Sequence, residues 1–185
     1  MPGRTAVRAV GGESVPALPD EGASLCAALE RPVGSVPPSN LVPPAGAVAV
    51  LLSDYTRGSA LKRLLGALLD ELERRGAGPD RVAIIIALGM HRRSGGAELA
   101  AHLGERVVDR WRVLEHDARS LDSLVDVGTT RRGTPCLLNR AAVEAALVIT
   151  LGSTSFHYFA GFGGGRKLIL PGIAAIALDA DFDAA

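Results

Sequence analysis

The sequence is short of several residue types, and each shortage argues against a class of protein. Its 185 residues include only two cysteines, which are far apart, so they form neither a disulfide framework nor a cysteine metal cage. Lys plus Arg equals Asp plus Glu, at 20 each, which argues against a nucleic-acid partner. No apolar run reaches the roughly 18 residues of a membrane span, and the first residues lack a signal-peptide core. We therefore expect a cytoplasmic protein that binds neither membrane nor nucleic acid.

The composition changes near residue 46. The first 46 residues are rich in proline and glycine, whereas the rest alternates between apolar runs and helical periodicity. This contrast predicts an N-terminal segment, residues 1–46, that packs on one α/β domain of residues 47–185. A short helix is expected near residues 24–30. The chain is long enough for that single domain to bury a real core.

Short apolar runs alternate with helical patterns along the second part of the chain. The runs predict four strands, at residues 47–52, 82–87, 112–114 and 146–151. Leucines at helical spacing predict a helix over residues 61–72, with Ser59 as its N-cap and Gly76 as its stop. Further helices are expected at residues 94–103 and 139–145. The alternation predicts a Rossmann-like parallel sheet with helices on both faces.

Polar side chains follow each of the predicted strands. Right-handed crossovers place the carboxyl ends of parallel strands at one edge of the sheet, where ligands bind in open α/β folds. Residues distant in sequence are therefore predicted to meet in one cleft. They are Asp54 and Arg57, His91 and Arg92, His116 and Asp117, and His157.

These residue types suggest acid–base chemistry on a small carboxylic acid. His91 and His157 both titrate near neutral pH and can act as a paired general acid and base. The Asp54 carboxylate can orient one imidazole, and the Arg57 guanidinium matches a substrate carboxylate. Simpler interpretations stand beside these, because an aspartate at a strand end is often a helix cap. His116 is better explained as a hydrogen-bonded structural histidine.

A glycine-rich loop follows His157. Gly161, Gly163, Gly164 and Gly165 allow positive φ and let backbone N–H groups converge on an anion, and Lys167 adds an amine. The loop is neither a P-loop nor a dinucleotide fingerprint, because the residues around the lysine and at the sixth position do not match. A flexible glycine loop beside a surface lysine is the alternative interpretation.

Four motifs together resemble a known family. They are Ser-Asp-Tyr-Thr-Arg at residues 53–57, Ala-Leu-Gly-Met-His-Arg at 87–92, Glu-His-Asp at 115–117, and the segment 157–172. In this order and spacing they resemble the N-terminal domain of the nickel-dependent lactate racemases, over roughly residues 25–175. The resemblance implies a 2-hydroxyacid racemase or epimerase that passes hydride to a nickel pincer nucleotide.

The resemblance also implies roles for individual residues. The cofactor, a pyridinium mononucleotide with thioamide and thioacid arms that hold nickel, would be bound covalently through Lys167. His91 and His157 would move the hydroxyl proton, one for each enantiomer, while Arg57 and Asp54 would hold the 2-hydroxy acid. The further cofactor contacts implied are Thr56, Gly163, Gly164 and Gly165.

The sequence departs from the family pattern at three kinds of position. Gly163 and Gly58 replace the family's usual Ser or Thr and its proline, and the histidine expected to ligate nickel after the Pro-Gly is not present. The family's second domain also has no counterpart in these residues, so a separate chain carrying it is a possible partner. The rival hypotheses are a non-catalytic or degenerate cofactor-binding protein and an unrelated Rossmann-like phosphate-binding enzyme.

Overall fold

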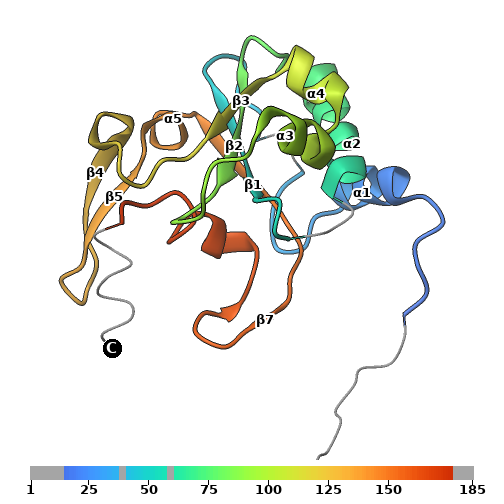
Figure 1. Cartoon of the computed structure of the whole chain (residues 1–185). Helices are drawn as coiled ribbons and strands as arrows, with labels where there is room; N and C mark the ends of the chain where they lie inside the picture. Colours follow the sequence, from blue (N-terminus) through green and yellow to red (C-terminus); the bar gives the residue numbers. More distant parts are fainter. Residues whose placement is uncertain (1–14, 38–40, 58–60, 177–185) are drawn as a thin grey trace, which may run out of the picture.

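The centre of the fold is a four-stranded parallel sheet. A computed structural model describes residues 15–37, 41–57 and 61–176. The sheet contains β1 (Val48–Ser53), β2 (Val82–Ala87), β3 (Arg112–Glu115) and β6 (Leu147–Leu151), in the order β3-β2-β1-β6 (Figure 1). All three pairings are parallel, so every strand ends at the same edge.

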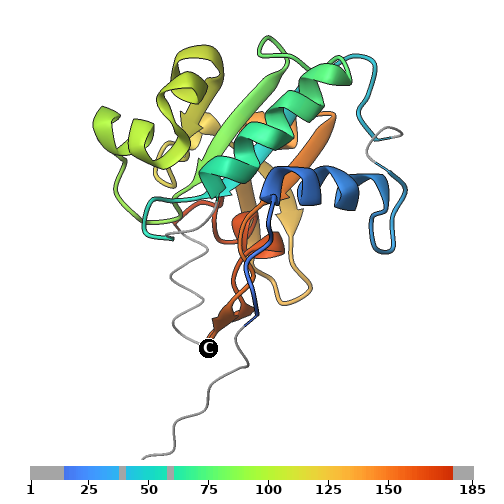
Figure 2. The same ribbon diagram turned by 90° about the vertical axis from the view of Figure 1, so that its right-hand side faces the viewer.

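Helices cover one face of the sheet. The alternate side chains Val48, Val50 and Leu52 of β1 face the amphipathic helix α2 (Leu61–Arg74), and both contribute to one buried cluster. The layer also contains α1 (Glu21–Glu30), α3 (Gly96–Leu103) and α4 (Glu105–Arg110). Figure 2 views this layer from the front, with α1 beside α2.

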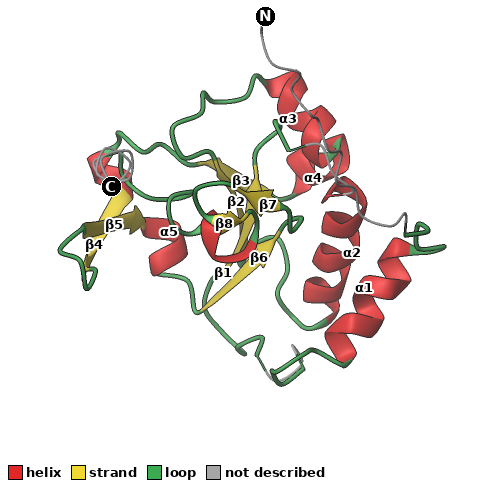
Figure 3. Cartoon of the chain, turned by 90° about the horizontal axis from the view of Figure 1, so that it is seen from below, coloured by secondary structure: helices red, strands yellow, loops and turns green. Residues whose placement is uncertain are grey.

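The opposite face carries a thinner cover. Ala49 and Leu51 of β1 pack with Ala142 of α5 (Arg140–Val143) and with Leu168 of the 3₁₀ turn η3 (Gly165–Leu168). A second turn, η2 (Leu121–Ser123), leads into an antiparallel hairpin of β4 (Leu124–Thr129) and β5 (Pro135–Asn139). Figure 3 shows the sheet between α1–α4 on one side and α5 with this hairpin on the other. With both faces covered, β1 and β2 read as continuous apolar runs.

A second, very short hairpin stands at the carboxyl edge of the sheet. It pairs β7 (Phe156–His157) with β8 (Gly161–Phe162) and leads through the glycine loop into η3. The chain then returns to the sheet, where the buried His116 holds it by hydrogen bonding to the carbonyl of Ala174 at 2.9 Å. The returning segment also forms a bridge between Ala174 and Leu138 of β5.

The predicted fold class is confirmed, because the parallel sheet has helices on both faces. The four predicted strands are present within one residue of their expected limits. The helix predicted over residues 139–145 is wrong in extent, because Asn139 ends β5 and also caps the short α5, with its side chain accepting from Ala141 N–H at 3.1 Å. Ser59 lies outside the described residues, and the proposed boundary at residue 46 stays a prediction.

Candidate functional site

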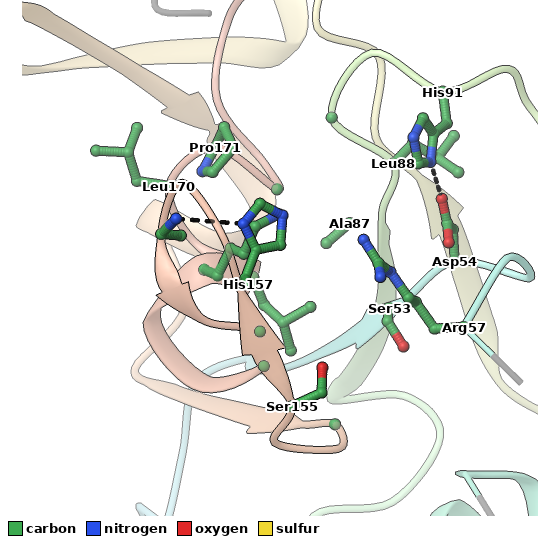
Figure 4. A pocket seen from close by; sticks show the side chains of 18 of the residues that line it. Ser53, Asp54, Arg57, Ala87, Leu88, His91, Ser155, His157, Leu170 and Pro171 are labelled. Carbon is green, nitrogen blue, oxygen red and sulfur yellow. Dashed lines mark hydrogen bonds and ion pairs between the residues drawn. The ribbon is translucent and has the colours of Figure 1, made fainter. Parts of the chain in front are cut away.

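A pocket of about 450 Å³ opens at the carboxyl ends of β1, β2 and β6. Its walls come from residues just after these strands, from the β7–β8 hairpin, from the glycine loop and from Pro171-Gly172. Figure 4 shows His91 with Asp54 on one side, His157 on the other, and Arg57 projecting into the space between them. The predicted convergence is therefore present for Asp54, Arg57, His91 and His157.

The Asp54 carboxylate is the buried anchor of the first wall. It is 3% exposed and accepts hydrogen bonds from the Thr56 backbone N–H (3.1 Å) and hydroxyl (2.6 Å). Its other oxygen contacts Nδ1 of His91, whose side chain is 53% exposed. Burial alone would raise the pKa of Asp54, but the bonds from His91 and Thr56 outweigh it and lower that pKa. The carboxylate is therefore ionised at neutral pH and fixes the His91 ring.

The opposite wall presents His157 in a different setting. Its Nδ1 accepts hydrogen bonds from the backbone N–H groups of Phe159 (3.3 Å) and Ala160 (3.2 Å) within the hairpin turn. Partial burial lowers the pKa of His157, and the positive charges of Lys167 and Arg57 lower it further. The ring is therefore biased towards its neutral form.

The glycine loop places Lys167 beside the pocket through close backbone packing. Gly164 has φ +73°, and a Cβ there would lie 2.6 Å from the carbonyl oxygen of Ser153. The Lys167 amide donates to the Gly164 carbonyl at 3.1 Å, which starts the turn that carries the lysine. The Gly163 amide donates to the Ser155 carbonyl at 2.7 Å, so this N–H is engaged within the fold. Only Gly164 and Gly165 of the three predicted cofactor glycines have positive φ.

Several predicted residues lie elsewhere. The prediction that His116 and Asp117 join the cleft is wrong, because the β3 end turns away: His116 is buried against Ala174 and Asn139, and Asp117 lines a separate hollow. Arg92 pairs with Glu98 outside the pocket wall. The Thr56 hydroxyl is committed to Asp54, so the structure gives it a supporting position.

Two features at the end of β1 were not predicted. His102 of α3, which had no assigned role, reaches the end of β1 with Nε2 2.9 Å from the Ser53 carbonyl oxygen. The Ser53 hydroxyl lines the pocket and is buried without a hydrogen-bond partner among the described residues. The position of His102 in its helix gave no signal for the contact, because that contact depends on how α3 packs.

Comparisons with known proteins show which family the chain belongs to. The family described as the lactate racemase N-terminal domain matches residues 1–178. The chain belongs to this family. Lactate racemase from Thermoanaerobacterium thermosaccharolyticum is 37% identical over 149 residues, which cover 80% of this chain and 35% of the relative. Lactate racemase from Lactiplantibacillus plantarum is 36% identical over 148 residues, covering 80% and 34% respectively.

Solved structures give the same result for the fold. The apoprotein of the Thermoanaerobacterium thermosaccharolyticum lactate racemase has a TM-score of 0.79 at 35% identity, over 85% of this chain and 37% of that one. A Thermotoga maritima protein shares the fold, with a TM-score of 0.68 at 24% identity. The chain spans about a third of the length of the lactate racemases it matches.

The described part of this lactate racemase N-terminal domain includes no group of three or more His, Cys, Asp or Glu side chains placed to hold a metal ion. The described helices also include none that is long and apolar enough to cross a membrane. The histidine, arginine, lysine and aspartate side chains of the pocket are thus the reactive groups that the described structure brings together.

Proposed function

We propose that the chain is the cofactor- and substrate-binding domain of a 2-hydroxyacid racemase or epimerase. The observation that carries the proposal is the pair of histidines on opposite walls of one pocket, with Arg57 projecting between them and Lys167 nearby. A racemase acts on both faces of one carbon atom, so it needs proton-transferring groups on two sides of the substrate. Membership of the lactate racemase N-terminal domain family supports this proposal.

Arg57 is the proposed anchor for the substrate carboxylate. Its guanidinium lies at the pocket and offers the planar pair of N–H donors that matches a carboxylate. With the carboxylate held there, the hydroxyl group of a 2-hydroxy acid lies within the space between the two imidazoles. His91, fixed by Asp54, is placed to take the hydroxyl proton, while the hydride of the neighbouring carbon–hydrogen bond would pass to the cofactor. The pocket volume of about 450 Å³ favours a small acid as the substrate.

Lys167 and the glycine loop are the proposed cofactor site. Lys167 and Gly164 line the pocket together with Ser53, whose buried hydroxyl oxygen has no hydrogen-bond partner among the described residues. A buried polar group without a partner is costly, so the Ser53 hydroxyl fits a polar group bound close to it. When bound through Lys167, a nickel pincer nucleotide would supply the hydride acceptor. The protein holds it and keeps the substrate oriented.

The open side of the pocket is the proposed contact for a second domain. Four aromatic side chains of the β7–β8 hairpin are more than half exposed: Phe156, Tyr158, Phe159 and Phe162. Such a cluster of exposed aromatic rings is typical of a contact surface. Because the chain spans about a third of the relatives' length, we propose that the remaining part of the enzyme, on this or a separate chain, covers this surface. Covering it would exclude water from the pocket.

Racemisation of single enantiomers of small 2-hydroxy acids tests the proposal. The chain is loaded with cofactor by co-expression with the cofactor-synthesis proteins and mixed with a polypeptide supplying the rest of a lactate racemase. We expect turnover of the mixture, little turnover by the 185-residue chain alone, and loss of activity in His91→Asn and His157→Asn. Arg132→Gln is the matched control, because Arg132 lies in the β4–β5 turn outside the pocket.

Two results would count against the proposal. Undiminished activity in both histidine variants would remove the acid–base roles. Cofactor binding without turnover of any 2-hydroxy acid, even with the second polypeptide present, would favour the alternative of a non-catalytic cofactor-binding protein.

A further inference from the structure

In both pocket histidines Nδ1 makes the contacts that hold the ring, but the partner is a hydrogen-bond acceptor at His91 and a pair of donors at His157. Nδ1 of His91 faces the carboxylate of Asp54, which only accepts hydrogen bonds when ionised. The lowered pKa of that carboxyl keeps it ionised at neutral pH. In the neutral ring, Nδ1 of His91 therefore carries the proton, and the lone pair is on Nε2.

His157 has the reverse arrangement. Its Nδ1 faces two backbone N–H groups, those of Phe159 at 3.3 Å and Ala160 at 3.2 Å. An amide N–H only donates, so Nδ1 must be the unprotonated nitrogen that accepts these bonds. The proton of the neutral ring is then on Nε2. In Figure 4 this second nitrogen faces the interior of the pocket.

We propose that the hairpin turn locks His157 as the Nε2–H tautomer, so that the two histidines are not equivalent. In this state Nε2 of His91 can accept a proton from a substrate hydroxyl. Nε2 of His157 can only donate a hydrogen bond, since a neutral ring protonated at Nε2 has no lone pair there. The Phe159 and Ala160 amides are thus positioning groups, and the turn of residues 158–160 decides which histidine is a base.

The consequence for the two substrate enantiomers rests on the proposed function. One enantiomer finds its base, His91, already in the required tautomer. The other needs His157 as base, which requires the proton to leave Nε2 and a proton from solvent to bind Nδ1. That change places an N–H opposite the two turn amides, so the turn must open and release its two hydrogen bonds. Because the two directions of racemisation pass through the same steps, opening of the hairpin belongs to proton transfer at His157 and not to proton transfer at His91, whichever enantiomer is consumed.

The tautomers are measured directly on the cofactor-free chain. Two-bond nitrogen–proton correlation spectra of the ¹⁵N-labelled protein separate protonated from unprotonated ring nitrogens, and His91→Asn and His157→Asn assign the signals. We expect the Nδ1–H form for His91 and the Nε2–H form for His157. Asp54→Asn should convert His91 to the Nε2–H form. A wild-type His91 in the Nε2–H form, or a His157 in the Nδ1–H form, would overturn the proposal.

Amide hydrogen exchange tests the turn itself. We expect the Phe159 and Ala160 amides to exchange about tenfold more slowly in the wild type than in His157→Phe, which has no acceptor. His157→Asn should keep the protection, because its side-chain oxygen can replace Nδ1. The Ile169 amide, which donates to the Arg166 carbonyl, is the control for an intact fold. Equal exchange in the two variants would refute the lock. No cofactor or substrate is present, so these results are independent of racemase activity.

Discussion

Replacing Gly164 by alanine should destabilise the protein through one steric contact. A Cβ at this position would lie 2.6 Å from the carbonyl oxygen of Ser153, and the residue has φ +73°. With ψ −173°, this backbone conformation costs an L-residue roughly 1–3 kcal/mol. Forcing a methyl group into a filled space costs roughly 1–3 kcal/mol more. Alanine also lowers the conformational entropy of the unfolded chain, and this stabilises the folded protein by roughly 0.4–1 kcal/mol. We therefore expect Gly164→Ala to lower the free energy of unfolding by about 1–6 kcal/mol.

Gly161→Ala is the matched control. Gly161 has φ +74°, and an added Cβ would meet nothing within 4 Å. Both variants place an L-residue at nearly the same positive φ, and the added methyl group meets Ser153 only in Gly164→Ala. A difference of about 2 kcal/mol corresponds to about 4–8 °C in Tm for a chain of this size, which thermal unfolding followed by circular dichroism resolves. Equal Tm values for the two variants would refute the close packing of the glycine loop.

Three further outcomes follow from the same structure. Asp54→Asn should reduce racemase turnover of the loaded enzyme by about 10³-fold or more, because His91 loses its required tautomer; unchanged turnover would contradict the role of Asp54. The unfolding free energy should fall as pH falls below about 6.5, because burial lowers the pKa of His116 and the unfolded chain binds the proton that the folded ring resists. Urea unfolding at two pH values in the His157→Asn background should show this fall, and His116→Phe should flatten it. Ile84→Ala, at a fully buried core position, should cost about 2–5 kcal/mol in urea unfolding, whereas Val148→Ala, at a 39% exposed position, should cost much less.

Much of the sheet could be predicted because its two central strands, β1 and β2, are buried on both faces. The runs at β1 and β2 are uninterrupted and apolar, and a polar cluster follows each within four residues. The β4–β5 hairpin was missed because its exposed strands carry no comparable pattern: Asp126, Gly128 and the turn at Gly133 read as loop. Its pairing is set by tertiary contacts, including the bridge between Leu138 and Ala174.

The site was predictable where a residue follows a central strand of the sheet within a few positions. Asp54 and His91 follow β1 and β2 and meet as expected. The prediction failed at His116. The strand before it, β3, is at the edge of the sheet, and the His116 side chain is buried against the carbonyl of Ala174 instead of facing the pocket. The contact of His102 with Ser53 and the two amides on His157 depend on packing and on a turn. Sequence spacing carries no information on either.

The mass of the intact protein after denaturation tests the central claim most directly, that this pocket is built to carry a nucleotide cofactor on Lys167. The chain is co-expressed with the cofactor-synthesis proteins and compared with two variants, Lys167→Ala and Arg166→Ala. We expect an added mass that survives denaturation in the wild type and in Arg166→Ala and is missing in Lys167→Ala. An adduct that denaturation removes from the wild type would make Lys167 an electrostatic contact, and an adduct retained in Lys167→Ala would contradict the claim.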